Sequence, residues 1–474
     1  MAVTLTPDIC VIGAGSGGLS VAAAAASMGV RVVLVEKARM GGDCLNYGCV
    51  PSKSLIAAAH VAHTMRHAKA FGVAGVEPQV DMAATRAHIR AVIAHIAPND
   101  SVERFGALGV KVIPATARFT SPTSCEAGEY VIHARRFVIA TGSAPAMPKL
   151  PGIELIRPLT NESVFDLDAL PSRLVILGGG PVGMEMAQAF RRLGSEVVVV
   201  ASHQILPRDD PELALPLRLE LQREGVILRE NATAVRVEPR GTGIRLFLQR
   251  QTTEETIDGS HLLIAIGRKP NVTDLGLDAA KVQYSAAGIK TGTNLRTSNK
   301  KIYAIGDVAG QGQFTHLANA HAGIVLRAIL FRLPARIHPD LVPHVTYCDP
   351  ELASVGLSEN QARAKGGVIH VLRWPFSEND RAQSERATAG LIKVITAANG
   401  RILGAAITGR GAGELISLWT LAIQNRMKIG AIAGMIIPYP TRSEVSRRAA
   451  IGYYSKSLRN PLLGPILRLL ARFG

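Results

Sequence analysis

The sequence is short of cysteine, and its few cysteines do not form a metal-binding pattern. Five are present among 474 residues, and three of them, Cys10, Cys125 and Cys348, stand alone. A zinc site usually needs a second Cys or His pair at a defined spacing, so this distribution excludes a zinc module and we expect no metal site. A chain of this length can bury its own hydrophobic core, which makes a stabilising disulfide framework unnecessary.

Long apolar runs and a secretion signal are also missing. No uninterrupted stretch of about 18 apolar residues occurs, so we expect no membrane-spanning helix. No basic segment precedes the first apolar run, which opens into glycines instead of a cleavage site, so we expect no signal peptide. The two absences predict a cytoplasmic protein, and in that reducing compartment a close cysteine pair is more often catalytic than structural.

Acidic residues are outnumbered by basic ones. The 37 Asp and Glu face 53 Lys and Arg, for a net charge of +16. The cations are scattered and no nucleic-acid-binding motif accompanies them, so we expect no nucleic-acid partner. The charge predicts a basic enzyme surface that attracts anions such as a phosphorylated cofactor.

The other two cysteines lie close together in "MGGDCLNYGCVPSK", residues 40–53. Cys44 and Cys49 are flanked by glycines and followed by Lys53. With a zinc half-site and a structural disulfide set aside, the pair predicts redox chemistry. That chemistry requires an electron source nearby.

Upstream of the cysteines, residues 8–37 have the pattern of strand, glycine turn, helix and second strand. The apolar run Ile9–Ile12 predicts a buried strand, and Glu36 ends the second strand. The turn glycines of the G-x-G-x-x-G pattern are Gly13, Gly15 and Gly18. Such glycines let a pyrophosphate approach a helix N-terminus, and the acid is placed to hydrogen-bond a ribose hydroxyl. The segment therefore predicts a dinucleotide site.

The same pattern returns further along the chain. Residues 174–177 predict a strand, and the glycines that follow it are Gly178, Gly180 and Gly183. The second strand, residues 197–200, runs into Ala201, Ser202 and His203 instead of an acid. An acid there would hydrogen-bond the 2′-hydroxyl of NAD and repel the phosphate of NADP. The absence of an acid favours NADPH, but no arginine is present to attract its phosphate, so we favour NADPH only narrowly over NADH. Ser202 and His203 are the candidate residues for contact with the nicotinamide cofactor.

Two dinucleotide sites and a cysteine pair predict a relay in which a nicotinamide reduces a flavin and the flavin reduces a disulfide. At this point the chain resembles the flavin-dependent pyridine nucleotide–disulfide oxidoreductases, which include dihydrolipoamide dehydrogenase, glutathione reductase and mercuric reductase. The resemblance covers nearly the whole chain. Its ordered motifs are "GAGSGG", "GGDCLNYGCVPSK", "VIATGSAP", "GGGPVGME", "AIGRKPN", "IYAIGDVA" and "YPTRSE".

This resemblance implies an α/β fold with two Rossmann-like dinucleotide-binding domains and a C-terminal α+β dimerisation domain. The implied boundaries are 1–150 and 270–338 for the two parts of the FAD domain, 151–269 for the NAD(P) domain and 339–474 for the dimerisation domain. In that family two subunits build each active site, so the implied assembly is a homodimer.

The resemblance also implies roles for single residues. Cys49 is the sulfur beside the flavin, and Cys44 is the interchange thiol that meets the substrate. Lys53 lies near the flavin N5 and pairs with Glu185, and a lysine there stabilises negative charge on the flavin and on the Cys49 thiolate. Asp307 matches the acid that hydrogen-bonds the ribityl chain. The other cofactor-binding residues that the resemblance implies are Lys37, Gly42, Thr141, Gly142, Gly267 and Ala318.

One position departs from the family pattern. Most disulfide-reducing members carry a histidine before "PT" in the last motif, whereas "IIPYPTRSEV" has Tyr439 there and keeps Glu444. An imidazole with a pKa of about 6.5 accepts a proton from a thiol at neutral pH, whereas a phenol with a pKa of about 10 is itself protonated. The substitution argues against fast exchange with lipoamide or glutathione disulfide. Mercuric reductases are similar in carrying a tyrosine here, but this chain lacks their terminal vicinal cysteines and their CxxC module. This departure argues against mercury reduction as a dedicated activity, whereas a soft metal ion can still meet Cys44 directly.

The C-terminal segment has its own pattern. Ile466, Leu469, Leu470 and Phe473 recur at helical spacing with arginines on another face, which predicts an amphipathic helix after Pro465. We favour packing of this helix on the protein's own dimer over contact with an anionic membrane.

These observations predict a cytoplasmic, homodimeric FAD enzyme that moves electrons from NADPH or NADH through Cys49 and Cys44. The expected acceptor is a disulfide or a thiol-reactive metal ion. One alternative is a dihydrolipoamide dehydrogenase that works in the NAD-reducing direction. Another is a redox-sensing or electron-transfer partner protein whose cysteines cycle without turning over a small substrate.

Overall fold

Contacts between residues divide the chain into two units. The computed structural model describes residues 2–455 and 463–473. The first unit comprises Met1–His203 and Gly225–Pro339, and the second comprises Gln204–Glu224 and Asp340–Gly474.

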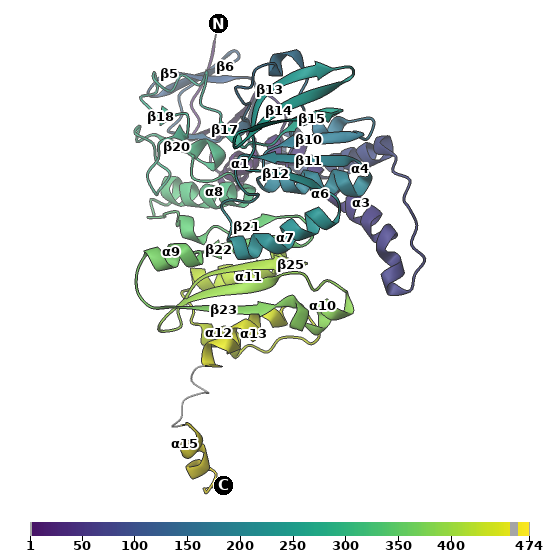
Figure 1. The fold of residues 1–474 in the computed structure, drawn as a ribbon. Coiled ribbons are helices and arrows are strands. Elements are labelled where there is room, and N and C mark those ends of the chain that lie inside the picture. The colour runs from purple at the N-terminus through teal and green to yellow at the C-terminus, as the bar shows by residue number, and fades with distance from the viewer. Residues whose placement is uncertain (1, 456–462, 474) are drawn as a thin grey trace. The chain divides into compact units, whose positions relative to one another are not determined.

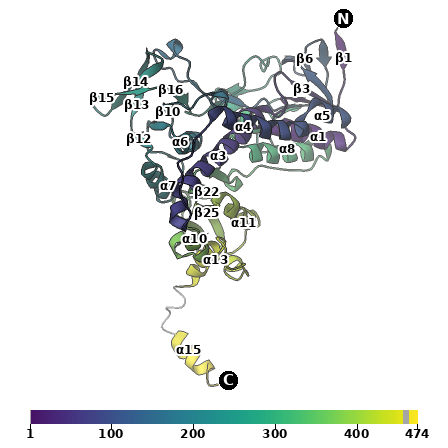
Figure 2. The same ribbon diagram turned by 90° about the vertical axis from the view of Figure 1, so that its right-hand side faces the viewer.

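A five-stranded parallel sheet forms the centre of the first dinucleotide-binding region (Figure 1). Its order is β20 (Ile302–Ala304), β8 (Arg136–Ile139), β2 (Ile9–Ile12), β3 (Val32–Glu36) and β4 (Lys111–Pro114). Helices α1 (Ser16–Ser27) and α8 (Thr315–Leu330) lie side by side against one face of the sheet (Figure 2). Because both faces of a parallel sheet are covered, its strands consist of nearly continuous apolar runs.

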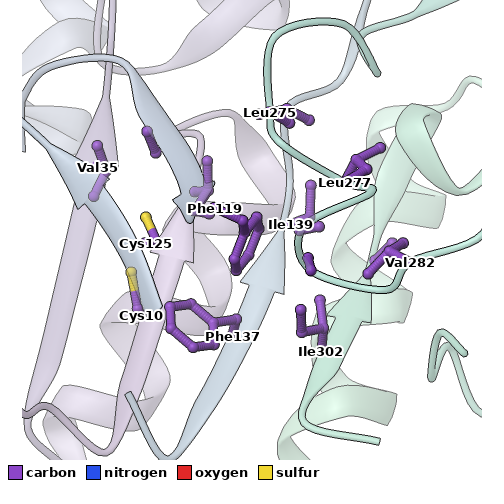
Figure 3. Packing of buried hydrophobic residues seen from close by; sticks show 14 of the residues in the cluster. Cys10, Val35, Phe119, Cys125, Phe137, Ile139, Leu275, Leu277, Val282 and Ile302 are labelled. Carbon is purple, nitrogen blue, oxygen red and sulfur yellow. The ribbon is translucent and has the colours of Figure 1, made fainter. Parts of the chain in front are cut away.

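The other face of this sheet packs on a second, four-stranded sheet. That sheet has the order β1 (Val3–Leu5), β7 (Tyr130–Ile132), β6 (Ser124–Ala127) and β5 (Ala117–Ser121). Between the two sheets, Cys10 and Cys125 lie beside each other (Figure 3). The rings of Phe119 and Phe137 pack edge to face there, with their centroids 5.1 Å apart. The hydrogen bond to Cys125 and complete burial raise the pKa of the Cys10 thiol, so the pair packs as small apolar groups.

The second dinucleotide-binding region repeats this plan. Its parallel sheet has the order β12 (Ile227–Glu230), β11 (Glu196–Ala201), β10 (Arg173–Leu177) and β16 (His261–Ile264), and α6 (Pro181–Leu193) follows β10. An antiparallel sheet of β13 (Thr233–Arg240), β14 (Gly243–Arg250) and β15 (Thr253–Gly259) shares its core. The remaining elements used below are α2 (Gly42–Asn46), α3 (Cys49–His67), β9 (Ser143–Pro145) and β17 (Arg268–Pro270).

The second unit is built on a five-stranded antiparallel sheet. Its order is β21 (His344–Thr346), β22 (Glu351–Gly356), β25 (Ile402–Gly409), β24 (Leu391–Ala397) and β23 (Ile369–Pro375). Helices α11 (Ala412–Gln424) and α13 (Glu444–Ile451) cover it, and the buried Trp419 donates its indole N–H to Ser446 at 3.1 Å. The unit also contains α7 (Pro211–Arg223), α9 (Glu359–Ala364), α10 (Asp380–Ser384), α12 (Ile429–Ala433) and α15 (Leu463–Leu470).

The predicted fold class is confirmed by the two parallel sheets with glycine turns and by the separate antiparallel unit. The expected boundaries between domains stay a prediction. Helix α7 falls within the range 151–269 in sequence, yet it packs with the second unit. The C-terminal helix begins at Leu463, two residues before the proline from which we expected it to start. Among the residues that the structure describes, no helix is long and apolar enough to cross a membrane.

Candidate active site

The first glycine turn joins β2 to α1 and is open on one side. Gly13 has a φ of +106°, and a Cβ on Gly18 would lie 1.9 Å from the carbonyl oxygen of Gly13, so the chain's own packing requires both glycines. A Cβ on Gly15 would meet nothing within 4 Å. That open space in front of the N-terminus of α1 fits a pyrophosphate. Beside it, Glu36 accepts the backbone N–H of Ala14 at 2.6 Å.

The second glycine turn, between β10 and α6, has the same geometry. Gly178 has a φ of +128°, and a Cβ on Gly183 would lie 2.1 Å from the carbonyl oxygen of Gly178. A Cβ on Gly180 would again meet nothing within 4 Å. The chain thus has two turns with room for a dinucleotide. In the second, β11 ends at the buried Ala201, and the exposed Ser202 and His203 follow.

The two redox candidates lie on consecutive helices. Cys44 is on α2, and Cys49 begins α3 with its sulfur 3.4 Å from the hydroxyl of Thr315, the first residue of α8. Lys53 follows one turn later on α3, and its Nζ lies 2.8 Å from Oε2 of Glu185 on α6. The structure therefore brings the cysteine pair, the lysine and the buried glutamate together. Helices α3 and α6, which carry this ion pair, pack against each other.

Both cysteines are free thiols in the structure, and their pKa values move apart. The hydrogen bond from Cys44, the hydroxyl of Thr315 and the charge of Lys53 lower the pKa of Cys49 to about 6, against the opposing effects of burial and of Asp43. The hydrogen bond to Cys49 and burial raise the pKa of Cys44. At neutral pH the pair therefore carries its negative charge on Cys49 and its proton on Cys44.

Arg268 connects three segments that are remote in sequence. Its Nε donates to the hydroxyl of Ser143 at 2.7 Å, and its Nη2 lies 3.2 Å from Oδ1 of Asp43. Ser143 in turn donates to Oδ2 of Asp307 at 2.5 Å. Burial raises the pKa of Asp307, while Ser143 and Arg268 oppose that rise. Asp307 was predicted from its motif, whereas Asp43, Ser143 and Arg268 were not predicted, although each lies within one of the quoted motifs.

The other residues implied for the flavin site support its frame. Thr141 and Asn271 exchange two hydrogen bonds, each 2.9 Å long, between the side chain of one and the backbone carbonyl of the other. A Cβ on Gly42 would lie 2.7 Å from Cα of Gly15, so glycine there lets the redox segment approach the first turn.

Four further residues were implied for cofactor binding. Gly142 and Gly267 have positive φ, Ala318 lies on α8 against Gly17, and Lys37 is exposed just after the end of β3.

Tyr439 and Glu444 lie in the second unit, whereas the cysteines lie in the first. The hydroxyl of Tyr439 donates to Oδ2 of Asp380 at 3.0 Å, and its ring is 70% exposed. This hydrogen bond, the charge of Asp380 and the charge of Glu444 raise the pKa of Tyr439. Asp380 was missed by the sequence analysis because no motif marks it.

Comparison with known proteins decides the family. Residues 7–323 match the family described as pyridine nucleotide-disulphide oxidoreductase, and residues 342–450 match the dimerisation domain of that family. The chain belongs to this family. The resemblance inferred from the motifs is thus confirmed, and so is the prediction of a flavin-dependent oxidoreductase. Membership implies FAD and a nicotinamide cofactor in general, and the dimerisation domain supports a homodimer.

Curated relatives with two different names match nearly the whole chain. The chain is 32% identical to a mercuric reductase of Lysinibacillus sphaericus over 456 residues, covering 94% of this chain and 82% of that protein. It is 34% identical to a dihydrolipoyl dehydrogenase of Bacillus subtilis over 452 residues, covering 94% of this chain and 95% of that protein. Relatives named for two different substrates are thus about equally similar to this chain.

Solved structures show the same fold. The Cu(II) complex of RclA from Escherichia coli, an HOCl-induced flavoprotein disulfide reductase, is 27% identical with a TM-score of 0.83, covering 93% of this chain and 98% of RclA. LpdA from Mycobacterium tuberculosis is 27% identical with a TM-score of 0.86, covering 95% of this chain and 99% of LpdA. Within the described part of this chain, no group of three or more His, Cys, Asp or Glu is arranged to hold a metal ion.

Proposed function

We propose that the protein is a cytoplasmic NAD(P)H-dependent reductase that passes electrons through Cys49 and Cys44 to a thiol-reactive metal ion or a disulfide. We place the metal ion first as acceptor at neutral pH. FAD, when bound, supplies the redox group between the nicotinamide and the cysteine pair. The two open glycine turns, one on each parallel sheet, support the binding of both dinucleotides.

The chain's own residues prepare the cysteine pair for this task. The hydrogen bond from Cys44, the hydroxyl of Thr315 and the charge of Lys53 stabilise the thiolate of Cys49 and lower its pKa to about 6. Glu185 fixes the position of the Lys53 ammonium. Arg268 neutralises the charge of Asp43, and it orients Asp307 through Ser143. The positive charge of Arg268 thereby offsets two carboxylates that lie close to a site where negative charge develops.

The observation that carries the choice of acceptor is the state of Tyr439. Its hydroxyl donates to Asp380 and its pKa is raised, so the phenol does not accept a proton from a thiol at neutral pH. The family resemblance implies that two subunits build each active site and that the residue at this position serves the interchange thiol. Because Cys44 also has a raised pKa, dithiol–disulfide exchange lacks a base at this step.

A soft metal ion does not need that base. NAD(P)H provides two electrons, which reduce one Hg²⁺ to Hg⁰ or two Cu²⁺ to two Cu⁺ and release NAD(P)⁺ and one proton. Reduction of a disulfide instead takes up that proton and one more to give two thiols. Thiolates are preferred ligands of such ions, which displace the proton from sulfur on binding. The names of the Lysinibacillus relative and of the RclA copper complex support both classes of acceptor.

An acceptor screen tests the proposal. The purified, FAD-loaded protein is assayed with NADPH and NADH against Hg²⁺, Cu²⁺, lipoamide and glutathione disulfide near neutral pH. We expect kcat/KM for at least one metal ion to exceed that for lipoamide by about 10²-fold, the lower part of what a general base contributes.

The double variant Cys44→Ser/Cys49→Ser is the control for reduction that bypasses the cysteines. Fast lipoamide reduction and slow metal reduction would replace this assignment with a dihydrolipoamide dehydrogenase. Consumption of NAD(P)H only at the rate of oxygen leakage, whatever the acceptor, would indicate a redox sensor instead.

A further inference from the structure

The segment beyond the family's dimerisation domain carries positive charge without negative charge. The match to that domain ends at residue 450. Residues 451–474 contain no Asp or Glu, and their cations are Lys456, Arg459, Arg468 and Arg472. No role in the active site described above uses this segment.

Helix α15 arranges the end of this segment into two faces. Hydrogen bonds from Ala471 to Leu467 and from Phe473 to Leu470, each 2.9 Å, continue the helical turn beyond Leu470. With 3.6 residues per turn, the large apolar side chains share one broad face, whereas the two arginines project from the opposite side. The apolar face consists of Leu463, Ile466, Leu467, Leu469, Leu470 and Phe473, and the basic face of Arg468 and Arg472.

The apolar face is exposed. Ile466, Leu467, Leu469 and Leu470 are 50–58% exposed, and Phe473 is 80% exposed. Adjacent large apolar side chains on one helix face mark a surface that binds an apolar partner. The partner must also tolerate the cations on the opposite side of the helix.

We propose that α15 binds the surface of an anionic phospholipid bilayer. A basic amphipathic helix lies in the interface with its apolar face among the acyl chains and its cations at the headgroups. A second copy of this chain offers the basic face of α15 less charge complementarity than an anionic surface does, because residues 451–474 of that copy are equally basic. The family's dimerisation domain is, moreover, matched within 342–450, without this segment.

This proposal reverses the preference stated from the sequence, which favoured packing on the dimer. Two observations change this preference. The apolar face of α15 is exposed, and the match to the dimerisation domain ends at residue 450, before the basic segment begins. The contact is peripheral, since α15 spans only Leu463–Leu470. The proposal does not depend on which electron acceptor the enzyme reduces, because its test measures binding to vesicles and not turnover.

Vesicle sedimentation tests the proposal. The full-length, FAD-loaded protein is mixed with vesicles of phosphatidylcholine alone or of phosphatidylcholine with phosphatidylglycerol, at about 0.1 M and about 0.5 M salt. We expect the anionic vesicles to bind at least about tenfold more strongly than the neutral ones, and high salt to weaken that binding.

Two variants and a matched control locate the contact. Arg468→Glu/Arg472→Glu and Ile466→Ser/Leu470→Ser should each lower binding about tenfold or more. Lys300→Glu/Lys301→Glu makes the same change in net charge at two exposed lysines of the first unit and should leave most of the binding intact. Equal loss of binding in this control would mean that overall charge, and not α15, attracts the vesicles, and the proposal would fail.

A fluorescence variant separates lipid from a second copy of the chain. The emission that Phe473→Trp adds to that of the two native tryptophans, obtained by subtracting the spectrum of the unmodified protein, should be that of an exposed indole in buffer and should shift to shorter wavelength when anionic vesicles are added. A blue-shifted emission before any vesicle is added, unchanged on addition, would show that the helix packs on protein. That result, or the absence of any response to vesicles, would overturn the assignment.

Discussion

Lys53 Nζ lies 2.8 Å from Glu185 Oε2, and this ion pair joins the redox segment to the second nucleotide-binding region. Lys53 is on α3, one turn after Cys49, and the side chain of Glu185 on α6 is 6% exposed. A buried carboxylate needs a cation, so Glu185 holds the ammonium group in place. The same ammonium group lowers the pKa of Cys49.

Lys53→Met should therefore raise the pKa of Cys49 from about 6 by about one unit or more, toward the ordinary thiol value. The measurement is the rate of iodoacetamide alkylation of the reduced protein against pH, with the modified cysteine identified by mass spectrometry. Lys69→Met, at an exposed lysine just beyond α3, is the matched control. An unchanged midpoint in Lys53→Met would show that Thr315 and Cys44 alone stabilise the thiolate.

The two sulfurs should differ in the FAD-loaded protein. Because Cys49 carries the thiolate, Cys44→Ser should show a long-wavelength charge-transfer band before any reduction, whereas Cys49→Ser should show none even after reduction. The band is followed by absorbance between about pH 6 and 9, a range that spans the ordinary and lowered thiol pKa values. A Cys44→Ser protein without the band at every pH would exchange the roles of the two cysteines.

The frame of this site is readable from the sequence because it depends on local pattern. The expected strand Ile9–Ile12 is β2, and Glu36, the acid expected at the end of the second strand, closes β3 and accepts the N–H of Ala14. Glycine spacing and apolar runs act over a few residues, so they mark the turns without knowledge of the rest of the chain.

The contacts that tune the site depend on tertiary structure and were not predictable in the same way. Arg268 meets Ser143 and Asp43, which are 125 or more residues away along the chain. Asp380 lies 59 residues before Tyr439, and no sequence motif includes it. A sequence pattern identifies such residues as polar, but only the fold shows which charges they neutralise.

The nicotinamide site should accept both cofactors. Ala201 ends β11 without a carboxylate, so this residue adds no charge that repels the 2′-phosphate of NADPH. We expect kcat/KM values for NADPH and NADH to differ by less than about a hundredfold. Ala201→Glu should depress the use of NADPH and spare NADH, because it would place two negative charges together. A thousandfold preference of the unmodified enzyme for NADH would contradict this prediction.

Lys393 should be a stabilising centre of the second unit. Its Nζ lies 2.7 Å from Asp210, 2.9 Å from Glu212 and 2.8 Å from Glu359, and its side chain is 6% exposed. Lys393→Met leaves these carboxylates without their shared cation and should destabilise the unit by about 3 kcal/mol. Lys365→Met removes an exposed ion pair with Asp340 and should change the stability by no more than about 1 kcal/mol.

The pH dependence of stability tests whether the lost ion pairs cause the destabilisation in Lys393→Met. Hydrogen bonds from Lys393 and Arg363 lower the pKa of Glu359 to about 2 in the folded protein, from about 4.3 in an unfolded chain. A lowered carboxyl pKa stabilises the fold above the unfolded value, and this contribution is lost as the pH falls toward 2. The difference in denaturation midpoint between Lys393→Met and the unmodified protein should therefore shrink between about pH 5 and pH 2. A constant difference would point to lost packing of the lysine stem instead.

Tyr439 should make disulfide reduction slow near neutrality. Its hydroxyl is bound to Asp380 and its pKa is raised, so it stays protonated where a histidine would act as a base. With lipoamide, kcat/KM should be low at about pH 7 and still be rising above about pH 9, because the raised pKa of Cys44 keeps this thiol protonated in the neutral range, and the profile should lack the descending limb of a bell. Tyr439→His should raise the neutral-pH value by about tenfold or more, within what a general base contributes.

Two further variants separate the acid–base role of this position from packing. Tyr439→Phe removes only the hydroxyl and should leave lipoamide reduction nearly unchanged, because a protonated phenol takes no proton from the thiol. Asp380→Asn keeps the phenol but removes the charge that raises its pKa, so its profile should also match the unmodified protein near neutrality. A large loss in Tyr439→Phe would mean that the hydroxyl assists the acceptor. A fast, bell-shaped profile in the unmodified protein would mean that another group supplies the base, because neither the phenol nor the Cys44 thiol gives a limb near neutral pH.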